Sequence, residues 1–360
     1  MQQQEVFKDL VVVELAGVLA GPAVGMFFAE LGARVVKVEN KRQGGDLTRK
    51  WKLPVEDPSA PASAYYHSVN WNKEVLFIDL SDPSGRTEVG ELIRTADILL
   101  VNFKAGDAEK FGLSSYHLRQ LHPALIIGEI TGFDDSARVA FDAILQAETG
   151  FMSMNGEEEG QPLKMPVALI DVLAAHQLKE GLLIALQQRM KTGEGAVVRA
   201  SLYRSAIASL MNQASIYLNE GEIPRRLGSL HPAIAPYGEV FICGDNRQLL
   251  LAVGTDEQFR KLCRVLGCEG LADDTRYATN AARVLNRKLL FEALAPAFRG
   301  MTSVECLSRL NEFHVPAGSV NDLAEVFSSP TAASMVLEQA EPDGTISRRV
   351  STVAFEINPK

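Results

Sequence analysis

The sequence predicts an α/β fold with a mostly parallel sheet in a large domain, accompanied by a smaller α+β domain. From Leu10 to Ile130, short apolar runs rich in β-branched residues alternate with helix-like segments, the pattern of strands joined by helices. The chain has 360 residues, which is more than one hydrophobic core usually serves. Hydrophobic residues make up 46% and charged residues 22%, as in ordinary globular proteins.

The first elements form a strand–helix–strand unit. Leu10–Leu15 is a continuous β-branched run, which predicts a buried strand. Pro22 suits the first turn of a helix, and Gly32 suits the position just after its end. Arg34–Val38 is the next strand. Two strands joined in this way are expected to be parallel neighbours in one sheet.

The alternation then continues along the chain. Further strands are expected at Val75–Leu80, Ile98–Phe103 and Ala124–Ile130, with helices at Gly85–Thr95 and Tyr116–Leu121. Helices between parallel strands cover both faces of a sheet.

Beyond residue 165 the segments lengthen. We expect a long, mostly buried helix at 168–189, a strand at 196–200 and a helix at 202–218, then strands at 239–242 and 248–253 and helices near 256–266 and 287–299. The segment 221–236 is rich in turn residues. The predicted division is 1–200 for the first part of the large domain, 201–224 for a linker, 225–310 for the small domain, and 311–360 for a second linker that returns to the large domain.

Charge and cysteine content exclude several classes of protein. The net charge of −9 argues against nucleic-acid and membrane partners. Locally, six basic residues stand against two acidic ones between Lys37 and Lys52, which predicts a site for a small polyanion or else a solvated basic loop. The four cysteines and six histidines show no metal-ligand spacing, so we expect no metal site. Free thiols and an N-terminus unlike a signal peptide predict a cytoplasmic protein.

The first strand-to-helix turn lacks the dinucleotide fingerprint. Its glycines fall at Gly17, Gly21 and Gly25 and do not form G-x-G-x-x-G, which argues against a dehydrogenase. Free amides at this helix N-terminus suit an anion, although close helix–strand packing is the alternative.

Asp171 is the strongest candidate for chemistry. In a helix it shares one face with Ala174, Ala175, Leu178 and Leu182, so its carboxylate is predicted to be buried. We expect the helix N-terminus to keep it ionised, which suits a carboxylate nucleophile. A structural acid at the start of the helix is the alternative. Phe141-Asp142 and Gln146 lie nearby in sequence and could orient a carbonyl or simply pack, and no Ser–His or Cys–His triad is recognisable.

Several motifs, in order, resemble the class III CoA-transferase family, also called the CaiB/BaiF family. They are Val18-Leu19-Ala20-Gly21-Pro22, Val36-Lys37-Val38-Glu39, Gly45-Asp46 with Arg49, Asn70-Trp71-Asn72-Lys73, Asn102-Phe103, Phe141-Asp142 with Gln146-Ala147, Asp171, Lys191-Thr192-Gly193-Glu194-Gly195 and His231-Pro232. The resemblance runs from Leu10 to about Gly318.

The resemblance implies a Rossmann-like large domain, an interlocked-ring homodimer and transfer of CoA from an acyl-CoA to a small carboxylic acid. Asp171 matches the family nucleophile, which carries CoA as an aspartyl thioester. CoA serves as co-substrate, and no other cofactor is implied. The CoA-binding positions carried over by motif are Val18, Leu19, Asn40, Lys41, Asn70, Asn72, Lys73, Asn102, Phe103, Lys110 and Val139.

At two positions the chain differs from other members of this fold, and each difference argues against one activity. Racemases of this fold carry His-Asp where this chain has Phe141-Asp142, so a proton-transfer base is missing for the alternative function of acyl-CoA racemase or isomerase. Formyl-CoA transferases carry a glycine run where this chain has Ser229–Tyr237, which argues against formyl or oxalyl substrates. A non-catalytic CoA-binding homologue is the other alternative. Among donors, the family suggests a dicarboxylate such as succinate.

Overall fold

The chain folds into two compact units. The structure, a computed structural model, describes residues 5–134 and 138–357. Within these ranges the first unit comprises residues up to 152, 164–222 and from 330 onward, and the second comprises 153–163 and 223–329. The first unit carries the candidate site and is described first.

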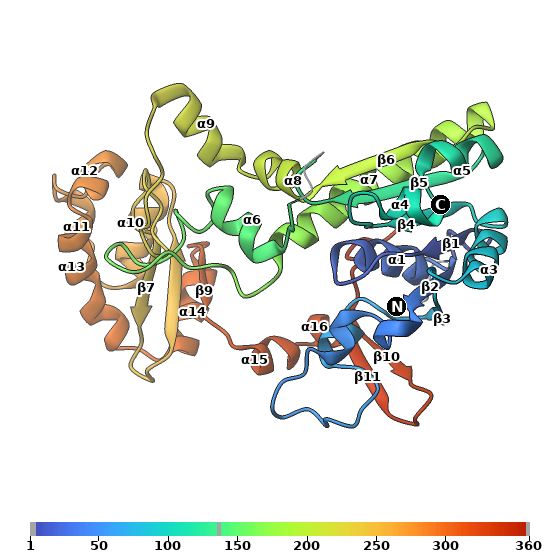
Figure 1. Ribbon diagram of the computed structural model, residues 1–360. Helices are drawn as coiled ribbons and strands as arrows, with labels where there is room; N and C mark the ends of the chain where they lie inside the picture. The colour runs from blue at the N-terminus through green and yellow to red at the C-terminus, as the bar shows by residue number, and fades with distance from the viewer. Residues whose placement is uncertain (1–4, 135–137, 358–360) are drawn as a thin grey trace. The chain divides into compact units, whose positions relative to one another are not determined.

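A six-stranded parallel sheet forms the centre of the first unit. Its strands are β1 (Val11–Glu14), β2 (Arg34–Asn40), β3 (Lys73–Ile78), β4 (Ile98–Val101), β5 (Ile126–Thr131) and β6 (Val197–Ser201), in the order β3-β2-β1-β4-β5-β6 (Figure 1). The predicted α/β fold with a parallel sheet is therefore confirmed. The strand order reverses between β1 and β4, which is where open sheets of this kind bind ligands.

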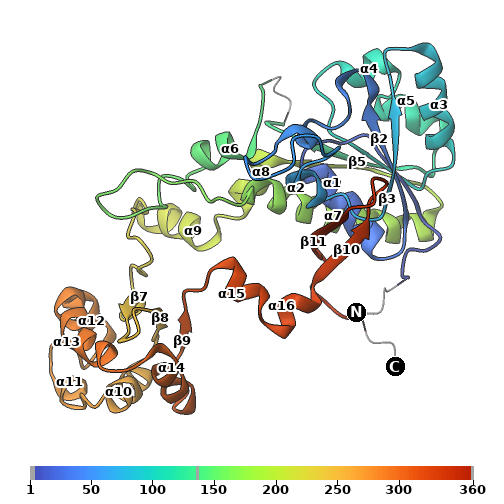
Figure 2. The same ribbon diagram turned by 90° about the horizontal axis from the view of Figure 1, so that it is seen from below.

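Helices cover both faces of this sheet. Successive strand residues point to opposite faces, and here the residues on both faces are apolar. Val12 and Ile98 pack with α1 (Ala20–Glu30), α7 (Leu169–Thr192) and α8 (Leu202–Ala208). Val13 and Leu99 pack on the other face with α3 (Pro83–Arg94) and α5 (Ser115–Leu121). Figure 2 shows the two helical layers on either side of the strands.

Shorter elements complete the first unit. They are η1 (Lys41–Gln43), η2 (Leu47–Lys50), α2 (Ala64–His67), α4 (Asp107–Phe111), α6 (Asp142–Glu148), α9 (Met211–Glu220), α16 (Pro330–Ser334) and the antiparallel hairpin of β10 (Val336–Ala340) and β11 (Ile346–Val350). The chain after the hairpin is held on α1, since the buried Glu30 carboxylate accepts hydrogen bonds from the amides of Thr352 (2.9 Å) and Val353 (3.0 Å).

The segment 201–224 differs from the predicted linker with a single helix. It holds two helices, α8 and α9, separated at Ser209 and Leu210, and Met211 has a left-handed φ of 41°. Leu202 and Ala206 of α8 are buried in the core of the first unit. The helix-like apolar pattern runs through the break, so the sequence alone does not mark it.

The second unit is built on a three-stranded antiparallel sheet. Its elements are β7 (Tyr237–Ile242), β8 (Gln248–Ala252), α10 (Asp256–Val265), α11 (Gly270–Asp273), α12 (Asn280–Leu285), α13 (Arg287–Arg299), α14 (Ser303–Glu312), β9 (Ala317–Ser319) and α15 (Leu323–Phe327). Phe241 and Phe298 stack in its core with ring centroids 4.3 Å apart. The unit extends past residue 310, because β9 pairs with β8. No described helix combines the length and the apolar character needed to cross a membrane.

Candidate active site

A cavity of about 660 Å³ lies beside the carboxyl ends of the parallel strands, at the reversal of strand order. Its lining residues come from the ends of β1 to β4 and from the loops and short helices that follow them. They are Leu15, Val38, Glu39, Asn40, Arg42, Gln43, Ile78, Asp79, Leu80, Ser81, Asn102, Phe103, Lys104, Asp107, Lys110 and Phe111.

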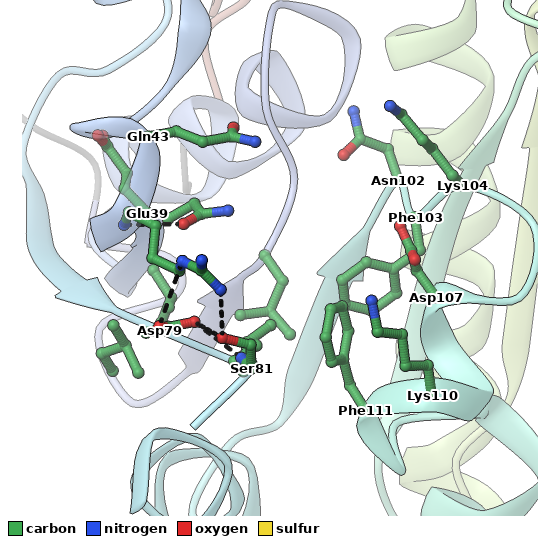
Figure 3. A pocket seen from close by; sticks show the side chains of 16 residues that line it. Glu39, Gln43, Asp79, Ser81, Asn102, Phe103, Lys104, Asp107, Lys110 and Phe111 are labelled. Carbon is green, nitrogen blue, oxygen red and sulfur yellow. Dashed lines mark hydrogen bonds and ion pairs between the residues drawn. The ribbon is translucent and has the colours of Figure 1, made fainter. Parts of the chain in front are cut away.

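The cavity combines cationic and apolar side chains. Figure 3 shows Lys104, Lys110 and the rings of Phe103 and Phe111 along the wall that follows β4, facing the wall that follows β2 and β3. On that second wall, Arg42 donates a hydrogen bond to the Ser81 hydroxyl at 3.1 Å. Such a lining suits a ligand that carries both negative groups and a flat ring.

The structure brings four of the predicted ligand residues together in this cavity. Asn40, Asn102, Phe103 and Lys110 line it. The other predicted positions lie outside the lining: Val18, Leu19, Lys41, Asn70, Asn72, Lys73 and Val139. Arg42, Gln43, Asp79, Ser81 and Lys104 line the cavity but were not predicted. Four of them follow the ends of predicted strands: Arg42 and Gln43 come after the strand at 34–38, Ser81 after the one at 75–80, and Lys104 after the one at 98–103. Asp79 lies within the strand predicted at 75–80.

Most cations of the basic segment, residues 37–52, are paired with other groups of the protein. Lys37 is buried and pairs with Glu14 (2.9 Å) and Asp46 (3.2 Å). Arg49 pairs with Glu39 at 2.6 Å. Lys50 and Lys52 donate hydrogen bonds to backbone carbonyls. Lys41 and Arg42 are exposed, and of the two Arg42 lines the cavity, where its Nε lies 3.9 Å from Asp79 Oδ2.

Lys73 and Asn70 are buried under helix α1. The Lys73 ammonium contacts Glu14 Oε2 (2.8 Å), the Pro22 carbonyl (2.8 Å) and Asn70 Oδ1 (3.1 Å). Burial lowers the pKa of Lys73 to about 8. Both side chains thus support the start of α1 from inside the fold, and a direct contact between either of them and a ligand stays a prediction.

The turn between β1 and α1 is strained and firmly held. Val18 has a φ of 71°, in the left-handed region that β-branched residues rarely adopt. The Asn102 side chain makes two hydrogen bonds to the backbone of Gly17, the residue before Val18. It accepts from the Gly17 amide (3.1 Å) and donates to the Gly17 carbonyl (2.9 Å). Asp46 Oδ2 accepts from the Val18 amide at 3.2 Å. Strain maintained in this way is typical of functional sites.

Asp171 lies in the first turn of α7 and is 8% exposed. The predicted helix face of Asp171, Ala174, Ala175, Leu178 and Leu182 is buried as expected. No group among residues 5–134 and 138–357 donates a hydrogen bond to its carboxylate. Burial, and then the charge of Asp142, raise the pKa of Asp171 to about 7. Burial and the like charge of Asp142 therefore oppose the ionisation that the helix N-terminus was expected to favour.

Asp142 and Gln146 of α6 hold the chain that leads into α7. Asp142 Oδ1 accepts from the Ile170 amide at 2.7 Å, and Asp142 Oδ2 accepts from Gln146 Nε2 at 2.6 Å. Gln146 Oε1 in turn accepts from the Met165 amide at 2.8 Å. The backbone on both sides of the α7 entry is thus tied to α6.

Tyr65 of α2 is a site residue that the sequence does not single out. Its side chain is half-buried. Burial, followed by the charges of Asp171, Asp142 and Asp46, raises the pKa of Tyr65 to about 12. The phenol is therefore protonated at neutral pH and lies within electrostatic range of both the α7 entry and the turn after β1.

These contacts connect the cavity with Asp171. Asn102 lines the cavity and holds the turn after β1, and Asp46 holds the same turn from the other side. The charges of Asp46 and Asp171 both contribute to the raised pKa of Tyr65. A desolvated carboxylate of this kind can attack an electrophilic carbonyl.

Comparison with known proteins identifies the family. The model of CoA-transferase family III matches residues 7–359. Succinate–glutarate CoA-transferase of Agrobacterium fabrum is 41% identical over 350 residues, covering 95% of this chain and 87% of that protein. Succinyl-CoA:glutarate CoA-transferase of Mus musculus is 33% identical over 337 residues, covering 92% and 76%.

A solved structure agrees with these sequence matches. The crystal structure of a CaiB/BaiF family protein from Brucella suis superposes with a TM-score of 0.85 at 35% identity, covering 98% of this chain and 93% of that chain. The family resemblance stated from the motifs is thereby confirmed. The chain therefore belongs to CoA-transferase family III and is a CoA-transferase.

Proposed function

We propose that the protein transfers CoA from the CoA thioester of a short dicarboxylic acid, such as succinyl-CoA, to a second dicarboxylic acid, with Asp171 as nucleophile. Two relatives, at 41% and 33% identity, are named for succinate or succinyl-CoA and glutarate, which supports this substrate class. The observation that carries the role of Asp171 is its buried carboxylate, which receives no hydrogen bond from the described residues. A carboxylate without donors is a stronger nucleophile than a solvated one.

The proposed reaction proceeds through two anhydrides and one thioester. The Asp171 carboxylate attacks the donor thioester carbonyl and releases CoA thiolate, leaving an acyl–aspartyl anhydride. The thiolate attacks the aspartyl carbonyl, which releases the donor acid and forms aspartyl-CoA. The acceptor carboxylate then attacks aspartyl-CoA, and the released thiolate attacks the acceptor acyl group and frees Asp171. Protons and electrons balance without a metal or a redox cofactor.

The cavity is the proposed site for the nucleotide end of CoA. Phe103 and Phe111 offer ring surfaces for the adenine, and Lys104 and Lys110 offer charges for the phosphates. Val18 and Leu19, in the turn after β1 that is next to Gly17 and its hydrogen bonds to Asn102, are proposed to meet the pantetheine arm.

Replacing Lys110 by Met is expected to weaken CoA binding about tenfold, because a charge-assisted hydrogen bond to phosphate is lost. Isothermal titration of CoA at several salt concentrations measures the effect, and the variant's affinity should depend less on salt. Lys191→Met, an exposed substitution at the end of α7, is the matched control. Equal CoA affinity in wild type and Lys110→Met would contradict the proposal that Lys110 contacts the CoA phosphates.

We also propose an interlocked-ring homodimer. Ile184 and Met190 of α7 and Leu218 of α9 are apolar and 57%, 88% and 77% exposed in the single chain. Exposed apolar side chains on long helices are typical of a surface that a second copy covers.

The proposed location is the cytosol. The cysteines Cys243, Cys263, Cys268 and Cys306 are all free, which suits a reducing compartment.

The decisive test of Asp171 is the capture of its CoA thioester. Wild type, Asp171→Ala and the control Glu180→Gln are incubated with a panel of acyl-CoAs, and intact mass is measured before and after hydroxylamine. Glu180 is an exposed carboxylate on the same helix. We expect a CoA adduct on wild type and Glu180→Gln that hydroxylamine removes, and none on Asp171→Ala. The donor that gives the adduct identifies the acyl group.

The opposite result is equally informative. Tight CoA binding without an adduct from any donor would contradict CoA transfer through Asp171 and favour a CoA-binding homologue without turnover. An adduct that persists in Asp171→Ala would move the nucleophile to another residue.

A further inference from the structure

Helix α7 begins without a cap of its own. Its N-cap residue Ala168 has no side chain able to accept a hydrogen bond, so the first amides of the helix need an acceptor from elsewhere. Asp142 supplies one, since its Oδ1 accepts from the Ile170 amide at 2.7 Å. Asp142 thus caps, from a different helix, the turn that carries Asp171.

Gln146 fixes Asp142 in this position. It lies one turn further along α6 and is completely buried. Its Nε2 donates to Asp142 Oδ2 at 2.6 Å, and its Oε1 accepts from the Met165 amide at 2.8 Å. Gln146 Nε2 also donates, at longer distances, to the carbonyls of Met165 (3.5 Å) and Val167 (3.4 Å). The two side chains therefore hold the segment 165–170 at both of its ends, and the three short hydrogen bonds carry the argument.

We propose that Asp142, held by Gln146, is a positioning residue that fixes the first turn of α7 and thereby aims the Asp171 carboxylate at the thioester. This role rests on the proposed function of Asp171 as nucleophile. Asp171 receives no hydrogen bond from the described residues, so its direction depends on the backbone that carries it. A shift of about 1 Å in a reacting group can cost about a hundredfold in rate. The charge of Asp142 is also a cause, after burial, of the raised pKa of Asp171.

The hydrogen bonds predict opposite effects for single and paired substitutions. In Asp142→Asn only one side-chain oxygen remains to accept from both the Ile170 amide and Gln146 Nε2. The new amide nitrogen, a donor, must then face one of these two donors. Rotating the Gln146 amide only moves the conflict to the Met165 amide. In Gln146→Glu two carboxylates face each other instead, one of them at a fully buried position. In the double variant D142N/Q146E, the introduced carboxamide donates to the introduced carboxylate and accepts from the Ile170 amide, and the carboxylate accepts from the Met165 amide, so the three short hydrogen bonds are restored. The two long donations to the Met165 and Val167 carbonyls are lost in Q146E and in the double variant alike.

The test measures kcat and KM for CoA transfer in these variants. We expect D142N and Q146E each to lower kcat about 10- to 100-fold with KM for the acyl-CoA nearly unchanged, and the double variant to recover most of the loss. Thermal unfolding gives the folded fraction at the assay temperature, so that kcat refers to folded enzyme. E148Q, which removes an exposed carboxylate of the same helix, is the control and should keep wild-type kcat.

Each outcome distinguishes this role from the proposed function. If wild type forms aspartyl-CoA and both single variants turn over at the wild-type rate, the positioning role is overturned while the proposed function stands. If D142N/Q146E is no faster than the single variants, Asp142 acts through its charge or through the fold, and the positioning role is again overturned. If wild type transfers no CoA from any donor, the proposed function fails first and this role fails with it.

Discussion

Replacing Asp171 by Asn is expected to abolish CoA transfer and, above neutral pH, to make the folded protein more stable. Loss of the nucleophile should lower kcat by at least about a thousandfold, because an amide neither attacks a thioester nor forms an anhydride. The gain in stability has a separate cause. The folded protein buries Asp171 beside Asp142, so the ionised side chain is penalised on folding.

The sign of the stability effect follows from the pKa. The pKa of Asp171 rises from 3.8 to about 7 on folding, so between these values the folded state holds a proton that the unfolded state has lost. The free energy of unfolding of the wild type therefore falls as pH rises through this window. Above the folded pKa the penalty is fully present and amounts to at most about 4 kcal/mol. Asp171→Asn removes it, whereas near pH 4 the two proteins should differ by less than about 1 kcal/mol.

Urea unfolding near pH 4 and near pH 8 checks this expectation, with Glu180→Gln as the control. The free energy of unfolding of Asp171→Asn should exceed that of wild type near pH 8 by a few kcal/mol. Equal stability of the two proteins at both pH values would mean that Asp171 ionises in the folded state without penalty. Residual transfer above about a thousandth of the wild-type rate would contradict its role as nucleophile.

Lys37→Met is expected to destabilise the protein by about 3–5 kcal/mol, because it leaves a buried carboxylate without its cation. Lys37 is fully buried and lies between Glu14 (2.9 Å) and Asp46 (3.2 Å). Glu14 keeps its contact with Lys73 at 2.8 Å, but the ion pair that Lys37 makes with Asp46 is lost. Since Asp46 accepts from the Val18 amide, the turn between β1 and α1 should loosen as well.

Urea unfolding at neutral pH measures this loss, and Lys41→Met is the matched control because Lys41 is exposed on the adjoining η1. High salt should not rescue Lys37→Met, since buried pairs are little screened. CoA titration of the folded fraction reports on the turn. Unfolding free energies within about 0.5 kcal/mol of wild type would contradict the structural role of the buried ion cluster.

The strands of the first unit's sheet were predictable because each is marked by the residues of its own short segment. Runs such as Val11–Glu14 and Ile98–Val101 are almost entirely apolar, as strands covered on both faces must be. The helix face of Asp171 was predictable for the same reason, since helical spacing decides which residues share a side. The break between α8 and α9 was not predictable, because the apolar pattern continues through it.

The charges of the site were less predictable, because they depend on residues far apart in the chain. Lys73 and Lys37 are both basic in the sequence, but each is paired with Glu14 once β1, β2 and β3 are side by side. The pKa of Asp171 rises partly because α6 brings Asp142 to the start of α7. Tyr65 has no sequence signal, since only the fold places it near Asp171, Asp142 and Asp46.

The sequence by itself determined the parallel α/β fold, the family and the candidate nucleophile, because strand hydrophobicity, helical spacing and ordered motifs are all properties of the chain. The tertiary structure decided which cations face the cavity, which support the fold, and in which direction the pKa of Asp171 moves. Burial and interactions between charges depend on distances in space rather than on positions in the chain. The capping of α7 by Asp142 and Gln146 is of this second kind, since it exists only where two helices meet.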